Sequence, residues 1–158
     1  MSNEAWKEPI INALKDAYDG SGGVYLDPGT NVVAELKSLT GAQASTILPG
    51  AGNSVVNQIR HLLITVDAHE PQFTGGNQPD LDWGSEWKDT QVTDAEWQAL
   101  VAEYEDTRDK FTQWISAPAV AEDYAFAAAA VMAATHMAYH TGQIRHAAAF
   151  AANHQGIS

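Results

Sequence analysis

The chain of 158 residues is 45% hydrophobic and can bury the core of a single globular domain spanning residues 1–158. Its 20 acidic and 8 basic residues give a formal net charge of −12, which repels phosphate backbones and anionic membrane surfaces and argues against nucleic-acid or membrane partners. It has no cysteine, which excludes disulfides and thiolate-bound metals and leaves imidazole and carboxylate as candidate metal ligands.

The first half of the sequence predicts two long helices joined by an irregular connection. Residues 4–18 place apolar side chains at helical spacing, and glycines from Gly20 onward end the pattern. Residues 24–52 contain several turns with Pro and Gly and predict only short helical pieces, at 32–39 and 43–47. Ser54 provides an N-cap for a second long helix, whose apolar residues from Val55 to Val66 repeat at helical spacing and which continues to about Pro71.

The second half predicts a loop and two further helices. Residues 75–84 are rich in Gly, Pro and Asp and indicate a loop. Thr93 and Glu96 form a capping-box pattern that starts a third long helix, which ends near Pro118. A fourth runs from Ala121 to about Asn153, and no segment alternates with the period of a strand. We therefore predict an all-α four-helix bundle with an irregular long connection between the first two long helices.

Histidines are concentrated in the fourth helix. No acidic residue follows Asp123, whereas four of the six histidines do. His136 and His140 lie four residues apart, so they project from one face of the helix and could bind one ion together. A pair of hydrogen-bonded core histidines explains this spacing at least as well. The core is expected on this face, which also carries Met132, Tyr139, Gln143, Ala147 and Phe150.

A third ligand has to come from another helix, because the fourth helix offers no carboxylate. The candidates are His61 and His69, both on the second long helix. His61 lies among polar residues of the helix, which suits a polar cavity inside the bundle or the surface, whereas His69 lies at the edge of the apolar stripe. We expect His146 and His154 to be surface residues.

Four aromatic residues and one arginine each allow two interpretations. Trp83, Trp87, Trp97 and Tyr139 could line a pocket, but aromatic residues in an all-α protein are more often buried in packing, and we expect packing here. Arg145 could receive an anionic substrate, but we expect it to pair with acids on a neighbouring helix.

Two segments resemble the DinB/YfiT-like superfamily of candidate metalloenzymes. They are Ser54 followed seven residues later by His61, and the sequence His136-Met-Ala-Tyr-His140-Thr-Gly-Gln-Ile near the C-terminus. The resemblance extends from the first long helix to about Phe150. It implies a helix bundle in which a histidine of the second helix and the H-x-x-x-H pair of the last helix bind one divalent metal. By this resemblance the ligands are His61, His136 and His140, supported by Gln143 and Tyr139.

The resemblance also implies a class of activity. Three imidazoles leave an open coordination position, which is typical of catalytic rather than structural zinc sites. All-nitrogen ligation favours zinc or nickel and also fits copper or iron. Activities implied by the resemblance are S-transfer or isomerisation of a small-molecule substrate with a low-molecular-weight thiol; a hydrolase is also compatible. Because no general base is evident, a non-catalytic metal-binding or stress-related bundle protein is the alternative.

Location and assembly are further expectations. No apolar run approaches the roughly 20 residues of a membrane-spanning helix. The first residues carry an acid where a secretory signal would carry lysines, so we expect a cytoplasmic protein. Alanines on the exposed face of the long fourth helix, together with the resemblance, predict a homodimer.

Overall fold

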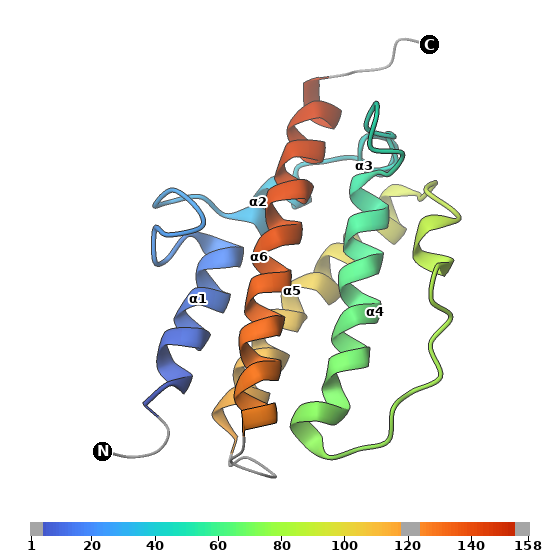
Figure 1. The fold of residues 1–158 in the computed structure, drawn as a ribbon. Coiled ribbons are helices and arrows are strands. Elements are labelled where there is room, and N and C mark those ends of the chain that lie inside the picture. Colours follow the sequence, from blue (N-terminus) through green and yellow to red (C-terminus); the bar gives the residue numbers. More distant parts are fainter. Residues whose placement is uncertain (1–4, 118–123, 154–158) are drawn as a thin grey trace.

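The computed structural model describes residues 5–117 and 124–153, which form helices and loops with no strand among them. The predicted all-α class is therefore confirmed. Four long helices lie side by side (Figure 1): α1 (Lys7–Asp19), α4 (Val55–Thr74), α5 (Asp94–Ser116) and α6 (Tyr124–Asn153). α6 lies between α1 and α4, and α5 packs against both of these helices from behind. The connections carry three short helices: α2 (Val32–Lys37), α3 (Gly41–Ala44) and the 3-10 helix η1 (Ser85–Trp87).

The ends of the long helices follow local signals in the sequence. α1 is followed by Gly20, whose left-handed conformation (φ 64°) favours glycine. Ser54 and Thr93 cap α4 and α5, and in each case the side chain three residues later completes a capping box. α4 continues past Pro71, where we predicted its end, because the stop comes from the left-handed Gly75.

The long connection between α1 and α4 is fixed to the start of α5. A Cβ on Gly41, the first residue of α3, would lie 2.6 Å from the carbonyl oxygen of Val92, so only glycine permits this approach. The N–H of Gly41 donates to Asp94 Oδ1 at 2.7 Å. The indole of Trp97 donates to the carbonyl oxygen of Leu36 at 3.1 Å. Both short helices are thereby held in place. The predicted short helices exist, with α3 slightly earlier than expected.

The core between the long helices is asymmetric in side-chain size. α1, α4 and α5 contribute large apolar side chains, whereas α6 contributes mainly alanines, which let its neighbours approach closely. The predicted core face of α6 is wrong at two positions, because Met132 is 60% exposed and Tyr139 is 62% exposed. The buried side chains of α6 include Phe126, Ala129, Ala130, Ala133, Ala134, Met137, Ile144, Ala147, Ala148 and Ala151.

Candidate metal centre

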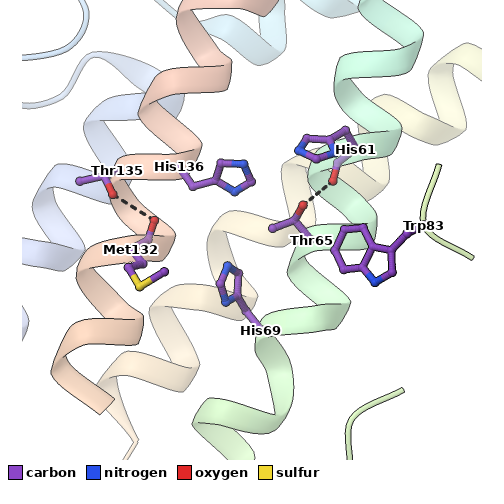
Figure 2. Close-up of a pocket in the computed structure, with 7 residues that line it drawn as sticks. All are labelled: His61, Thr65, His69, Trp83, Met132, Thr135 and His136. Atoms are coloured by element: carbon purple, nitrogen blue, oxygen red, sulfur yellow. Dashed lines mark hydrogen bonds between the residues drawn. The ribbon is translucent and has the colours of Figure 1, made fainter. Parts of the chain in front are cut away.

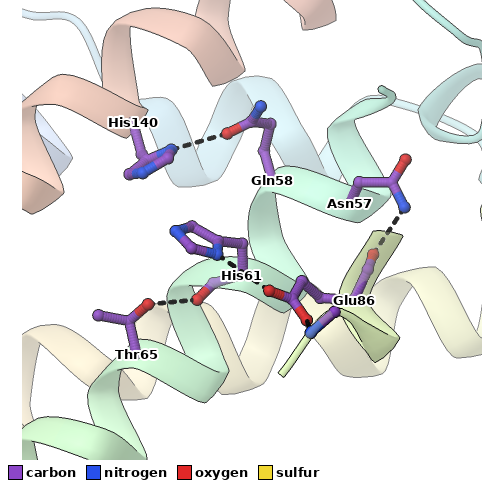
Figure 3. Close-up of polar contacts among 7 residues, drawn as sticks. Asn57, Gln58, His61, Thr65, Glu86 and His140 are labelled. Atoms are coloured by element: carbon purple, nitrogen blue, oxygen red, sulfur yellow. Dashed lines mark hydrogen bonds and ion pairs between the residues drawn. The ribbon is translucent and has the colours of Figure 1, made fainter. Parts of the chain in front are cut away.

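Three histidines meet between α4 and α6 (Figures 2 and 3). His61 extends from α4, and His136 and His140 extend from successive turns of α6. Each offers one ring nitrogen, and these three atoms lie within 4.8 Å of one another. A zinc ion with Zn–N distances of about 2.0–2.1 Å holds two nitrogen ligands about 3.3 Å apart. The three nitrogens would therefore have to move together by at most about 1.5 Å to reach the spacing of zinc ligands.

Gln58, one turn before His61 on α4, orients the ring of His140 (Figure 3). The Oε1 atom of Gln58 lies 2.7 Å from His140 Nδ1, and both side chains are buried. Because an amide oxygen can only accept a hydrogen bond, Nδ1 carries the proton and donates. The Nε2 atom of His140 therefore keeps a free lone pair, as a metal ligand requires.

Glu86 of η1 orients His61 in the same way. Its Oε1 lies 3.3 Å from His61 Nδ1, and its Oε2 accepts a hydrogen bond from the Gly84 N–H at 2.7 Å. Burial raises the pKa of Glu86, but the hydrogen bonds from the backbone and from His61 outweigh this effect, and the pKa lies below its usual value. A buried carboxylate therefore lies behind the His61 ring and leaves its Nε2 free.

The cap of α4 positions the η1 segment. Asn57 Nδ2 donates to the backbone carbonyl oxygen of Glu86 at 2.7 Å, and Asn57 Oδ1 accepts hydrogen bonds from the N–H and the hydroxyl of Ser54, each at 3.0 Å. The guanidinium of Arg60 donates to the carbonyl oxygen of Asp89. The serine of the predicted motif thus starts the helix and also helps to anchor the loop that holds the site.

Two of the clustered imidazoles are neutral at neutral pH. Burial lowers the pKa of His136, and the neighbouring His61 and His69 lower it further. Burial, together with His136 and His61, lowers the pKa of His140 to about 4. A neutral imidazole is the form that binds a metal, so these two rings need not lose a proton first.

A cavity of about 500 Å³ opens beside the cluster (Figure 2). Its lining residues are His61, Thr65, His69, Trp83, Met132, Thr135 and His136. Two of the three clustered histidines therefore form part of its wall. The volume lies within the range of small-molecule sites, about 300–1,000 Å³. An ion held by the cluster would face a space that a small molecule can enter.

A model of the DinB superfamily matches residues 29–144, a span that includes all three clustered histidines. The chain belongs to the DinB superfamily. No curated protein and no solved structure matches it significantly. None of the helices in the described ranges of this DinB superfamily member combines the length and apolar character that crossing a membrane requires.

Of the four aromatic residues that could either pack in the core or line a pocket, this DinB superfamily member buries one and places three at the site. Trp97 is fully buried, as packing predicts. Trp83 is 55% exposed and lines the cavity. Trp87 and Tyr139 are also exposed and lie against two of the clustered histidines, with ring centroids 5.1 and 4.9 Å apart. The expectation of packing is therefore wrong for these three residues, which surround the site.

The other residues named from the sequence lie around the cluster. His69 lines the cavity, and His61, not His69, belongs to the cluster. Gln143 lies beside a second cavity of about 540 Å³, and its supporting role at the metal ligands stays a prediction. His146 is exposed, as expected, and Arg145 pairs with an acid of α2, also as expected. His154 lies outside the described residues.

Sequence reasoning missed Gln58 and Glu86. Gln58 lies three residues before His61 and therefore on the same side of the helix. This spacing could have indicated that Gln58 lies beside the histidine cluster. Glu86 lies between two tryptophans in a loop, 25 residues away from its histidine partner, and no spacing rule connects the two.

Proposed function

We propose that this DinB superfamily member is a metal-dependent enzyme in which His61, His136 and His140 bind one divalent ion. The convergence of their ring nitrogens supports the proposal most strongly. Core histidines that only satisfy hydrogen bonds need a partner for each ring but have no reason to bring their other nitrogens together. Here Gln58 and Glu86 bond to one nitrogen of His140 and of His61, and one nitrogen from each of the three rings lies within 4.8 Å of the other two. A cation between these nitrogens would offset the repulsion of their lone pairs.

The chain prepares the site in three ways. Two side chains fix the ligand rings, burial keeps two imidazoles neutral, and exposed aromatic rings cover two of the histidines. When bound, a divalent ion would supply a Lewis acid with an open position toward the cavity. Zinc or nickel suits the nitrogen ligands best, and iron also fits. The family resemblance supports S-transfer or isomerisation with a low-molecular-weight thiol on a small-molecule substrate, with hydrolysis as the second reaction class.

A non-catalytic metal-binding or stress-related bundle is the second candidate function. One observation favours it: the cavity wall contains no lysine or carboxylate among the described residues, so histidine is the only candidate general base there. A purely structural zinc site fills all four positions with protein ligands. Only three protein nitrogens converge in the described part of the chain, which favours the enzyme.

Metal binding by untagged protein tests the ligand assignment. The wild-type protein should bind about one zinc or nickel ion per chain, and saturating metal should raise its melting temperature. His61→Ala, His136→Ala and His140→Ala should each abolish most of this rise, whereas the controls His69→Ala and His146→Ala should keep it. If His69→Ala loses metal binding while His61→Ala keeps it, the ligand assignment is wrong. If the wild-type protein binds no metal, the metal site itself is refuted.

The open position can be tested separately with cobalt-substituted protein. If the ion has an open position, adding 2-mercaptoethanol should change the visible spectrum and produce a sulfur-to-cobalt charge-transfer band in the near ultraviolet. A spectrum that responds to neither thiol nor azide would support the structural role. The matched control is cobalt-treated His140→Ala protein, which should show neither the initial spectrum nor the new band.

A further inference from the structure

None of the described residues that line the cavity beside the three histidines is Lys, Arg, Asp or Glu. Burial lowers the pKa of His69, with Gln72 acting more weakly in the opposite direction, so this imidazole is also neutral at neutral pH. A charged molecule that enters the cavity would lose hydration and gain no opposite charge from these side chains. Without an ion on the three histidines, the side chains of the wall therefore favour an uncharged ligand.

Two large apolar side chains stand on opposite sides of this cavity (Figure 2). Trp83 approaches from the segment before η1 and is 55% exposed, and Met132 approaches from α6 and is 60% exposed. Exposed apolar side chains around a concave site are typical of ligand-binding surfaces. An apolar group placed between them would remove surface of both side chains from water.

His69 supplies a polar group away from the histidine cluster. It follows His61 by eight residues on α4, which places it about 12 Å further along the helix axis. Its Nδ1 is enclosed by protein and makes no hydrogen bond of normal geometry, although Gln72 lies close enough to affect the pKa of the ring, so Nε2 is the nitrogen that we assign to a ligand. The hydroxyls of Thr65 and Thr135 donate to carbonyl oxygens of their own helices, so they offer only lone pairs to the cavity.

We infer that the cavity binds a small uncharged molecule whose apolar body lies between Trp83 and Met132 and whose hydroxyl or similar polar group bonds to His69 Nε2. A hydroxyl both donates and accepts hydrogen bonds. It can therefore bond to either tautomer of a neutral imidazole, and it can donate to a threonine lone pair. The inference deepens the proposed function, because it names a substrate class for the same site. The apolar contacts and the bond to His69 do not require the ion, so they can be tested without it.

Three probes with the same body separate the effect of charge. Benzyl alcohol, benzoate and benzylammonium can be titrated into chelator-treated full-length protein, and their dissociation constants measured from NMR chemical shifts. Benzyl alcohol should bind at least about threefold more tightly than either ion, because the wall offers no compensating charge. This order applies to the metal-free protein, because a divalent ion on the histidines would itself attract benzoate.

Matched variants locate the probe in the cavity. Trp83→Ala and Met132→Ala should each weaken benzyl alcohol binding by about threefold to tenfold through lost apolar contact. His69→Phe should weaken it by a similar factor of about threefold to tenfold, because one hydrogen bond is lost. Two controls should leave binding unchanged. Ile47→Ala removes an apolar side chain that is 44% exposed but does not line the cavity, and His146→Phe replaces an exposed histidine elsewhere on α6.

Several results would overturn the inference. They are no detectable binding of benzyl alcohol, tighter binding of benzoate or benzylammonium to the metal-free protein, or the same affinity in Trp83→Ala as in Ile47→Ala. A change in mass by light scattering in Trp83→Ala, without a change in alcohol binding, would assign the exposed side chains to a protein contact and would also overturn it. If the protein binds no metal but prefers the alcohol as described, the proposed function fails and this inference is supported.

Discussion

Gln58 and Glu86 determine which nitrogen is free on two of the three clustered histidines. A histidine ligand is oriented, and its basicity raised, by the acceptor bonded to its second nitrogen. The acceptor behind His140 is a neutral amide, whereas the acceptor behind His61 is a buried carboxylate. We therefore expect Glu86 to have the larger effect on metal affinity.

Replacing Glu86 with Gln should weaken metal binding by about 10-fold to 100-fold. The amide keeps the size of the side chain but loses its charge, and its NH2 group would face one of two donors, the His61 ring or the Gly84 N–H. Competition with a chelating indicator measures the affinity, and circular dichroism checks the helix content. Glu70→Gln, at an exposed acid on α4, is the control and should bind metal normally. Equal affinities of the two variants would contradict the role of Glu86.

The clustered histidines could be predicted from the sequence, but their neighbours could not. The spacing of His136 and His140 follows from one turn of helix, and the resemblance selects His61. Glu86 lies 25 residues from its histidine, and Gln58 lies 82 residues from His140. Such contacts arise only when helices and loops pack together, and no local periodicity encodes them.

At the scale of helices, boundaries were easier to predict than buried faces. Caps and stops depend on residues within one turn, as Ser54, Thr93 and Gly20 show. The face that a helix buries depends on its neighbours. In α6 the close approach of α1 and α4 selects alanines, so large side chains such as Met132 and Tyr139 lie outside the core. A hydrophobicity pattern favours the large residues and therefore misplaced this face.

The loop after α1 is organised around one buried carboxylate. Asp16 is 1% exposed and accepts hydrogen bonds from the four backbone N–H groups of residues 22–25, at 2.6–2.9 Å. Burial raises the pKa of Asp16, but these four hydrogen bonds outweigh it and hold the pKa below its usual value. The ionised form therefore stabilises the loop and the C-terminal end of α1.

Asp16→Asn should lower the free energy of unfolding by about 2–4 kcal/mol at neutral pH, because an amide cannot accept all four bonds. The folded pKa lies below the unfolded value of about 3.9, so the contribution of Asp16 is complete well above that value and is lost as the pH falls through the folded pKa. The difference between variant and wild type should therefore shrink toward about pH 3 in urea titrations. Asp27→Asn, at an exposed acid of the same loop, should have little effect at either pH. A difference that stays constant with pH would contradict this account.

At the scale of the whole molecule, negative charge is absent from the outer face of α6. The chain carries a net charge of −12, yet no acidic residue follows Asp123. α6 lies in front of the other helices in Figure 1, and its exposed residues outside the cavity and the histidine cluster include Val131, His146 and Ala149. Two copies could meet along this face without bringing carboxylates of α6 together. The single domain over residues 1–158 and the cytoplasmic location stay predictions.

We predict that the protein forms a homodimer through the outer face of α6. Two monomers of charge −12 repel each other, and salt screens this repulsion, so dimerisation should strengthen as ionic strength rises. Ala149→Glu would place a carboxylate on the exposed part of α6 and should shift the mass toward the monomer. Ala102→Glu makes the same change on the exposed side of α5 and should leave the dimer intact. Light scattering across micromolar concentrations measures the mass. A monomer at every concentration, in both low and high salt, would refute the homodimer, and equal loss in both variants would place the interface elsewhere.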